Sequence, residues 1–231
     1  MVMIKHGVAM PDFPKTDPNT VRRLANRGHY DKATIYPIID EALICQVGFV
    51  QDQQPFVIPM IHARLNDTLY LHGATANRLL NHIEAGNPLC ISITLLDGIV
   101  FARSVFHHSM NYRSVALFGK GEVLEGDDEK LRALEVISNH IVRGRWKDAR
   151  LPNQREMDTT TVVAVQIESA SAKIRTGPPN DNPEDYELPV WAGVLPLRET
   201  PLPPVPDPKL PDGIGIPDYV LTFDRSVKGT P

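Results

Sequence analysis

The sequence has 231 residues and a mass of 25.7 kDa, with 42% hydrophobic and 23% charged residues, an ordinary globular mixture. This length allows one large domain or two small ones and is ample for a real core. The net charge of −4 and the pI near 6.1 provide no global basic field for nucleic acid or an anionic membrane.

Targeting and membrane signals are missing from the sequence. No stretch approaches the ~20 apolar residues that a membrane span needs, and the first fifteen residues hold no apolar run typical of a signal peptide. Cys45 and Cys90 lie in apolar runs and are expected to be reduced core thiols. We therefore expect a cytoplasmic protein without a nucleic-acid or membrane partner.

The two ends of the chain differ in composition from its middle. Residues 1–30 are polar and predict an arm with one short helix around Asn19–Asn26. Residues 196–217 hold eight prolines, too many for a packed helix or a central strand. They predict a tail or strap over the domain surface, with a proline-rich ligand motif as the alternative. The expected division is an arm (1–30), a central domain (31–195) and a Pro-rich tail (196–231).

Helical patterns occur at three places in the central domain. Residues 31–43 predict a helix with Thr34 as its N-cap, which leaves Pro37 in the tolerated first turn. Residues 75–85 predict a short amphipathic helix. Residues 127–143 show the most regular helical spacing and carry acidic residues at the positive N-terminal end.

The remaining runs are rich in β-branched and aromatic residues and are separated by turn residues, so they predict antiparallel strands and hairpins. Gly119 and Gly121 lie inside one of these runs and indicate a bulge. Six or seven short strands interrupted by a small helix favour a barrel with helices at its ends. The expected strands are residues 43–50, 55–62, 68–72, 88–95, 98–106, 113–124 and 161–168, with a further segment at 172–175.

The sequence lacks the well-defined motifs of common catalytic and nucleotide-binding sites. The sequence contains no dinucleotide or P-loop glycine fingerprint, no HExxH, no GxSxG and no paired CxxC. The eight histidines lack metal-ligand spacing, so no metal site is expected. A basic cluster at residues 143–150 surrounds Trp146. We interpret it as basic residues that oppose the dipole at a helix C-terminus rather than as a nucleic-acid patch.

One segment, residues 69–80, combines features of an anion site. A strand is expected to end at His72, Gly73 permits a tight turn, and a helix is expected to begin near Thr75, so that backbone N–H groups point outward. Arg78 lies one turn into the helix, where its guanidinium can bind a phosphate, and Asn77 offers a neutral donor. The alternative is that Thr75 only caps the helix and Arg78 is solvated.

The order of these elements resembles the FMN-binding split barrel of the pyridoxamine 5′-phosphate oxidase-like superfamily, and most closely its flavin-nucleotide-binding branch, which includes the nitroimidazole-resistance proteins. The resemblance covers about residues 25–200. The segments that carry it, besides the opening helix, are Pro55–Pro59, Tyr70–Arg78, His108–Val115, Arg143–Trp146, Ser171–Pro178 and Leu188–Pro196. The implied fold is mainly β with helices: a six-stranded antiparallel split β-barrel with flanking helices that forms a homodimer.

The resemblance also implies a flavin site at the dimer interface. The flavin ring is expected on the strand around Ile58–Ile61, the phosphate at the turn that follows the next strand, and one aromatic side chain from the partner subunit. His72 is expected beside the flavin as a catalytic hydrogen-bond or proton donor, unless it only closes the turn through a backbone carbonyl. The cofactor-binding residues expected in this way are Ile58, Pro59, Met60, Ile61, His72, Gly73, Asn77, Arg78, Asn111, Arg113, Ser114 and Trp191.

Departures from that family narrow the expected activity. Ile58 and Ala63 stand where vitamin B6 oxidases carry basic residues, and the substrate-binding Arg-Leu-Ser-Pro-like ending is missing, so oxidation of vitamin B6 is not expected. Leu79 replaces a second basic residue after Arg78, so the phosphate is expected to depend on Arg78 alone. We expect an FMN-dependent oxidoreductase that passes electrons from NAD(P)H to a small oxidised substrate such as a nitro compound or quinone, and the alternative is a module that stores or senses flavin or haem without turnover.

Overall fold

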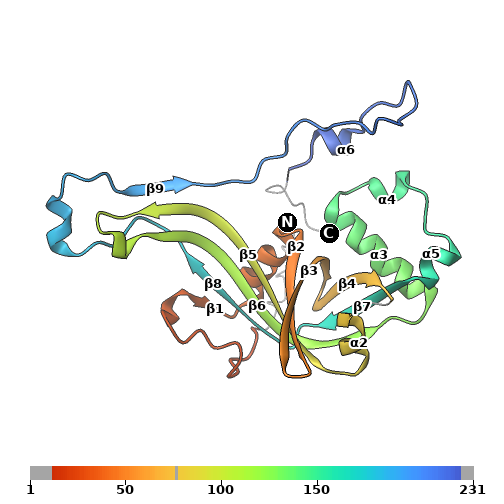
Figure 1. Cartoon of the computed structure of the whole chain (residues 1–231), viewed down its shortest axis with the longest axis horizontal. Coiled ribbons are helices and arrows are strands. Elements are labelled where there is room, and N and C mark those ends of the chain that lie inside the picture. The colour runs from red at the N-terminus through yellow and green to blue at the C-terminus, as the bar shows by residue number, and fades with distance from the viewer. Residues whose placement is uncertain (1–11, 76–77, 225–231) are drawn as a thin grey trace, which may run out of the picture.

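The computed structural model describes residues 12–75 and 78–224, and the account that follows is confined to them. The strands pair in the order β1-β8-β6-β7-β4-β3-β2-β5-β9, and β5 also pairs with β6. Strands β2, β3, β4, β7, β6 and β5 therefore close into a ring, which confirms the expected split-barrel fold (Figure 1). The strands are β1 (Gly28–His29), β2 (Ile44–Gln51), β3 (Gln54–Leu65), β4 (Thr68–Ala74), β5 (Pro88–Phe101), β6 (Ser109–Val123), β7 (Thr160–Gln166), β8 (Ser169–Arg175) and β9 (Gly193–Pro196).

Helices cover the ends and one side of this ring. α1 and α2 bury apolar residues such as Ile35, Ile39, Leu79 and Leu80, and these join the core that fills the ring. α3 packs against β3, β4 and β7. The α-helices are α1 (Lys32–Glu41), α2 (Arg78–Glu84), α3 (Asp127–Ile141), α4 (Arg145–Asp148), α5 (Gln154–Asp158) and α6 (Asp218–Leu221), and the 3-10 helices are η1 (Ala25–Arg27), η2 (Val105–His107) and η3 (Pro183–Glu187).

The two predicted hairpins around β3 are present, and their turns explain the registers. Asp52 and Gln53 both have positive φ, 50° and 63°, which is the backbone that a two-residue turn between antiparallel strands requires. Asn66 has φ 54° in the turn from β3 to β4. Small polar side chains tolerate this left-handed backbone better than branched ones do.

Two predictions at the N-terminal side were wrong, the helix over 19–26 and the N-cap of the helix that is present as α1. Instead of a helix over 19–26, only η1 forms, because the buried side chain of Asn19 bonds the backbone at Thr16, Pro14 and Ala170. The N-cap of α1 is Asp31 rather than Thr34: the N–H of Thr34 donates to the Asp31 carboxylate over 2.7 Å. Pro37 consequently lies inside the helix and not in its first turn.

The strands predicted at 88–95 and 98–106 are one continuous strand, β5, which has a register shift between Leu96 and Gly98. β5 and β6 form a long curved hairpin, and its outer half extends away from the ring as an arm, with η2 at its tip (Figure 1). Gly119 is not in a bulge. The ladder runs regularly through it, and a Cβ there would lie 2.0 Å from the carbonyl oxygen of Gln166, where β6 crosses from β8 to β7.

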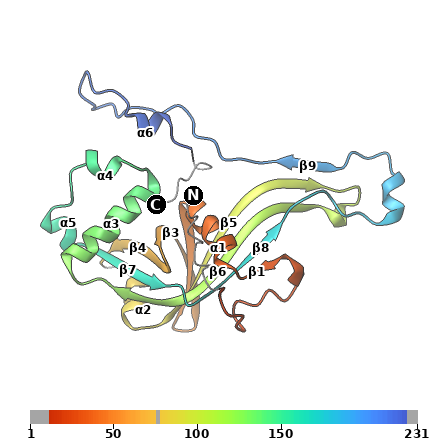
Figure 2. The same cartoon turned by 180° about the vertical axis from the view of Figure 1, so that it is seen from behind.

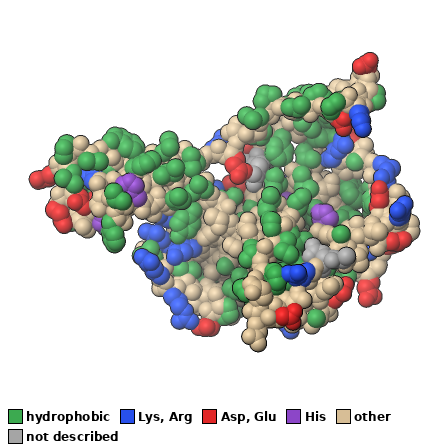
Figure 3. Space-filling view, in the orientation of Figure 1, with side chains coloured by type: hydrophobic (Ala, Val, Ile, Leu, Met, Phe, Trp, Pro, Cys, Tyr) green, Lys and Arg blue, Asp and Glu red, His purple; other side chains and the backbone are tan. Residues whose placement is uncertain are grey.

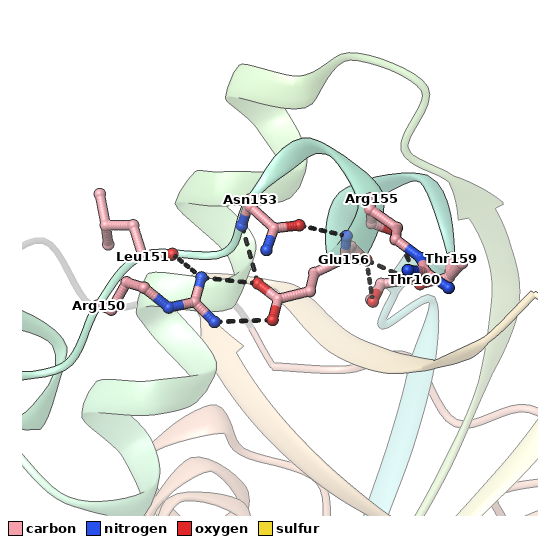
Figure 4. A network of polar contacts seen from close by, with 7 residues as sticks. All are labelled: Arg150, Leu151, Asn153, Arg155, Glu156, Thr159 and Thr160. Carbon is pink, nitrogen blue, oxygen red and sulfur yellow. Dashed lines mark hydrogen bonds and ion pairs between the residues drawn. The ribbon is translucent and has the colours of Figure 1, made fainter.

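The segment between α3 and β7 holds helices that the sequence reasoning did not predict. Asn153 begins α5 with a capping box, in which its side chain accepts from the Glu156 N–H while the Glu156 carboxylate accepts from the Asn153 N–H (Figure 4). Arg150 donates two hydrogen bonds to the same carboxylate and lowers the pKa of Glu156 to about 2. This network fixes the start of α5 at the surface.

The Pro-rich tail leaves the arm and returns to the helical side of the molecule. β9 pairs with the outer half of β5, residues 197–216 are exposed, and α6 brings Tyr219 next to Gly144 before α4 (Figures 1 and 2). We call the exposed residues 197–216 the strap.

Candidate functional site

The ring is split at one place, between β3 and β4. β3 pairs with β2 from Gln54 to Ile61, but it pairs with β4 only from His62 to Leu65. β4 meanwhile continues along β7 as far as Ala74. The peptide groups of β3 before His62 therefore have no strand partner on the β4 side. An edge of this kind presents backbone donors and acceptors to whatever lies beside it.

Side chains alternate along this open edge. Pro59 and Ile61 point outward and are exposed, whereas Met60 is buried and Ile58 packs against the core. Of the four residues predicted to hold the flavin ring, two thus present their side chains outward, and the other two can meet a ligand only through their backbone. Figure 3 shows a column of hydrophobic side chains over the central strands β2 and β3, beside a hollow that lies below the C-terminal segment.

His72 lies on β4 and shares the outward face of Ile61, because Ala63 and Tyr70 are directly opposite each other in the ladder. Its ring is half-buried, and its Nδ1 is enclosed without a hydrogen-bond partner among the described residues. Burial lowers the pKa of His72 below the ordinary 6.5, so that the neutral imidazole is favoured. Within residues 12–75 and 78–224, no backbone carbonyl forms the hydrogen bond with His72 that would merely close the turn.

Arg78 begins α2 and is exposed. Its guanidinium carbon lies 4.3 Å from the ring centroid of Phe56, on the inner side of the open β3 edge, and Phe56 in turn stacks on Phe49. This stacking orients a cation beside the edge. Gly73 pairs with Thr161 on the β7 side, and Asn77 lies outside the described residues.

The other predicted site residues form a second group on the arm. Asn111 is buried, donates to the Gly177 carbonyl and accepts from Arg175. Arg113 forms ion pairs with Glu41 and Asp97, which raise its pKa. Trp191 is 68% exposed and lies 5.9 Å, ring to ring, from Phe101.

Ser114, from the same group, donates to the Lys173 carbonyl over 3.2 Å and lines a surface cavity. Figure 1 shows that the arm, with β9 beside it, extends from the ring on the side away from β4. One chain therefore does not bring Trp191 to His72, and a site that uses both residues needs a second chain.

Sequence reasoning missed Phe56 as the platform for Arg78. Alternation along β3 carried a usable signal, because it separates Pro59 and Ile61 from Ile58 and Met60. The prediction that both cysteines are core thiols was wrong for Cys90, which is exposed on the outward side of β5 opposite Gly48. Cys45 is buried, and this burial raises its pKa to about 12.

Two searches of the described residues bear on other functions. No helix in this part of the chain is long and apolar enough to cross a membrane. Within the same residues, no group of three or more His, Cys, Asp and Glu side chains is arranged to hold a metal ion.

Comparison with known proteins agrees with this geometry. A solved structure, the flavocytochrome Anf3 from Azotobacter vinelandii, is 36% identical and has a TM-score of 0.87, and the match covers 93% of this chain and 99% of that one. An FAD and haem binding protein from Mycobacterium smegmatis is 32% identical with a TM-score of 0.81, covering 84% and 96%. A candidate 5-nitroimidazole antibiotic resistance protein from Bacteroides thetaiotaomicron is 29% identical with a TM-score of 0.55, covering 64% and 86%.

Sequence comparison leads to the same family. No curated protein matches the chain. The family profile described as pyridoxamine 5′-phosphate oxidase matches residues 31–174. The chain belongs to the pyridoxamine 5′-phosphate oxidase-like family of split-barrel proteins.

Proposed function

We propose that this protein is a flavin-dependent oxidoreductase whose flavin lies along the split between β3 and β4. The observation that carries the proposal is the open backbone edge of β3, which offers unpaired peptide groups beside exposed apolar side chains. A flavin ring needs this combination, because its faces are apolar and its pyrimidine edge is polar. A bound flavin supplies the electron transfer, so an acid–base pair in the protein is not required.

The residues beside the edge have distinct roles in this proposal. Arg78, held on Phe56, binds the flavin phosphate together with backbone N–H groups near Gly73. His72 presents a neutral imidazole on the same face as Ile61 and donates a hydrogen bond to the bound cofactor or a proton to its substrate. Ser114 and Trp191 act from the arm of a partner subunit, with Asn111 and Arg113 supporting that arm.

The identity of the flavin is the next part of the proposal. The family resemblance pointed to FMN, whereas one of the two relatives that span most of the chain is described as an FAD protein. The description of that protein also names haem, and the second relative is described as a flavocytochrome. We therefore extend the proposal to FAD and haem. His72, a neutral imidazole with an unpartnered nitrogen, has the chemistry of a haem ligand.

The experiment is reconstitution followed by anaerobic reduction. Purified protein is titrated with FMN, FAD and haem, and the loaded protein is mixed with NADH or NADPH. We expect quenching of flavin fluorescence at micromolar protein and bleaching of the oxidised flavin. Binding without reduction by either nucleotide would support the storage alternative, and a lack of binding to both flavins would overturn the proposal.

A matched pair of variants tests the location. Ile61 and Leu65 lie on the same face of β3 and are 39% and 38% exposed, but only Ile61 lies in the split, because Leu65 pairs with Thr68 of β4. Ile61→Asp is expected to abolish flavin binding, and Leu65→Asp is expected to leave it unchanged. His72→Ala then separates the two roles of that residue, because loss of haem alone assigns it to the iron and loss of flavin alone assigns it to the flavin.

A further inference from the structure

A cavity of about 340 Å³ lies between the N-terminal segment and the outer face of β5, β6 and β8. It is separate from the split of its own chain, but its lining includes Ser114, which we propose to act at the flavin site of a partner subunit. Residues 18–23 form one wall, and the sheet forms the other. Figure 2 shows the N-terminal segment beside β1 and β8. The volume exceeds what a simple ion occupies and lies at the lower end of the range for small-molecule sites.

The N-terminal wall is held in place by a buried polar anchor. Asn19 is 2% exposed, and its side chain accepts from the Thr16 N–H over 2.8 Å and donates to the carbonyls of Pro14 and Ala170. The bond to Ala170 ties the segment to β8. Hydrogen bonds within the chain therefore tie this wall of the cavity to the sheet.

All charged side chains that line the cavity are basic. Arg22, Arg23 and Lys173 line the cavity, and none of the lining residues is acidic. Arg22 pairs with Asp17 at the surface, while neither Arg23 nor Lys173 has an ion pair within the described part of the chain. Figure 3 shows Lys and Arg side chains gathered below the arm. In a chain with a net charge of −4, this local excess of positive charge favours an anion.

The sheet wall supplies neutral donors next to these cations. Thr94 is opposite Ser114 in the β5–β6 ladder, and Ser114 is opposite Lys173 in the β6–β8 ladder, so that the three side chains form a row across the sheet. The hydroxyls of Ser92 and Thr94 have no hydrogen bond among the described residues. Hydroxyls beside guanidinium and ammonium groups are a donor set that suits phosphate oxygens.

We propose that this cavity binds the phosphate groups of a nucleotide. Arg23 and Lys173 neutralise the phosphates, Ser92 and Thr94 donate to their oxygens, and the remaining volume takes the uncharged part of the ligand. The inference rests on the proposed function for the sources of that ligand, which are the adenylate half of FAD and the reduced nicotinamide nucleotide. Both carry the same diphosphate chemistry.

Calorimetric titration with ADP alone tests the cavity in the absence of a flavin. We expect ADP to bind the wild-type protein and Arg23→Glu or Lys173→Glu to weaken it roughly 10- to 100-fold, since each removes a charge-assisted contact. Lys147→Glu, an exposed cation on α4, is the matched control and should bind ADP like the wild type. Equal ADP affinity in all four proteins, or no ADP binding at millimolar concentration, would overturn the inference. Circular dichroism checks that each variant folds. If Arg23→Glu does not fold, Arg23→Gln takes its place.

Two further titrations distinguish the sources and separate this inference from the flavin proposal. Weaker FAD binding with unchanged FMN binding in Arg23→Glu assigns the cavity to the adenylate half of FAD. Unchanged FAD binding with weaker NADPH or NADH binding assigns it to the nicotinamide nucleotide. If neither flavin binds but ADP affinity still depends on Arg23, the proposed function fails and the nucleotide site stands.

Discussion

Lys32 at the start of α1 places its ammonium 2.6 Å from the carboxylate of Asp67 in the β3–β4 turn, and Tyr36 donates to the same carboxylate. The Lys32 side chain is only 10% exposed. This group ties the helix that covers one end of the ring to the hairpin that borders the split. The Lys32 ammonium and the Tyr36 hydroxyl lower the pKa of Asp67, while burial and the Asp67 carboxylate raise that of Tyr36.

Asp67→Asn is expected to destabilise the fold by about 1.5–3 kcal/mol, because it leaves a largely buried ammonium without its counter-charge. Urea unfolding at neutral pH measures this. Asp17→Asn is the control, since Asp17 pairs with Arg22 at the open surface, and it should change the free energy of unfolding by less than about 0.5 kcal/mol. Equal effects of the two substitutions would contradict the structural role of Asp67.

Arg78→Ala is expected to weaken FMN binding by roughly 1.5–3 kcal/mol, because the guanidinium contacts a charged phosphate. Riboflavin, which has no phosphate, provides the internal control: its affinity should be the same for Arg78→Ala and the wild type. Fluorescence quenching measures both. Equal losses for FMN and riboflavin would place Arg78 at the ring instead of the phosphate.

The pH dependence of stability reports on His72. Its folded pKa lies below the unfolded value of 6.5, so the unfolded chain binds more protons as the pH falls. The wild type should therefore lose stability as the pH falls below about 6.5, down through the lowered folded pKa. His72→Gln removes this proton binding, and its melting temperature should fall less over the same interval. Parallel curves for the two proteins would show that His72 is not held neutral by the fold.

Gly119 tests the crossing of β6 from β8 to β7. Gly119→Ala places a methyl group against the backbone of Gln166, which cannot move aside as a flexible side chain can, and is expected to cost more than about 3 kcal/mol or to prevent folding. Gly215→Ala is the matched control, because no atom lies within 4 Å of its added Cβ. It should stay within about 0.5 kcal/mol of the wild type. Thermal melting compares the two.

Substitutions at the tip of the arm test the proposed homodimer. Val105 and Phe106 are consecutive residues and are 85% and 89% exposed, and adjoining exposed apolar side chains mark contact surfaces more often than single ones do. We expect sedimentation to show a dimer of the 25.7 kDa chain and Phe106→Glu to shift it toward monomer. Leu202→Glu, at an equally exposed position in the strap (84%), should leave the dimer intact. A monomeric wild type that still binds flavin fully would reject the shared site.

The ring of strands was predictable because most β-rich runs are bounded by clear turns, and five of its six strands, all except β6, begin within a residue of the predicted positions. The merged strand β5 was not, since Asp97-Gly98 has turn composition but is absorbed as an irregularity by pairing with β6 and β9. β9 also eluded prediction: four residues ending in proline form a strand only because β5 offers an edge.

Local elements of the candidate site were predictable from the sequence, and contacts between distant residues were not. The sequence predicts a strand that ends at His72 and a helix that places Arg78 one turn from its start. The structure has His72 and Gly73 within β4, which continues to Ala74, and Arg78 at the described start of α2. The local order of the sequence does not predict the ion pairs of Arg113, because Glu41 and Asp97 come from distant parts of the chain. The stacking of Arg78 on Phe56 is hidden for the same reason.

The closure of the ring has a consequence for the order of assembly. The hairpins β2–β3, β3–β4 and β5–β6 join neighbouring segments, whereas β4 and β7 join Thr68 to Gln166 across 98 residues. Contacts of such separation carry a larger loop-closure cost than local ones and are expected to form late. The strand that carries His72 therefore takes its final position only when β7 docks. A chain truncated before β7 should possess every residue of the split and still bind no flavin.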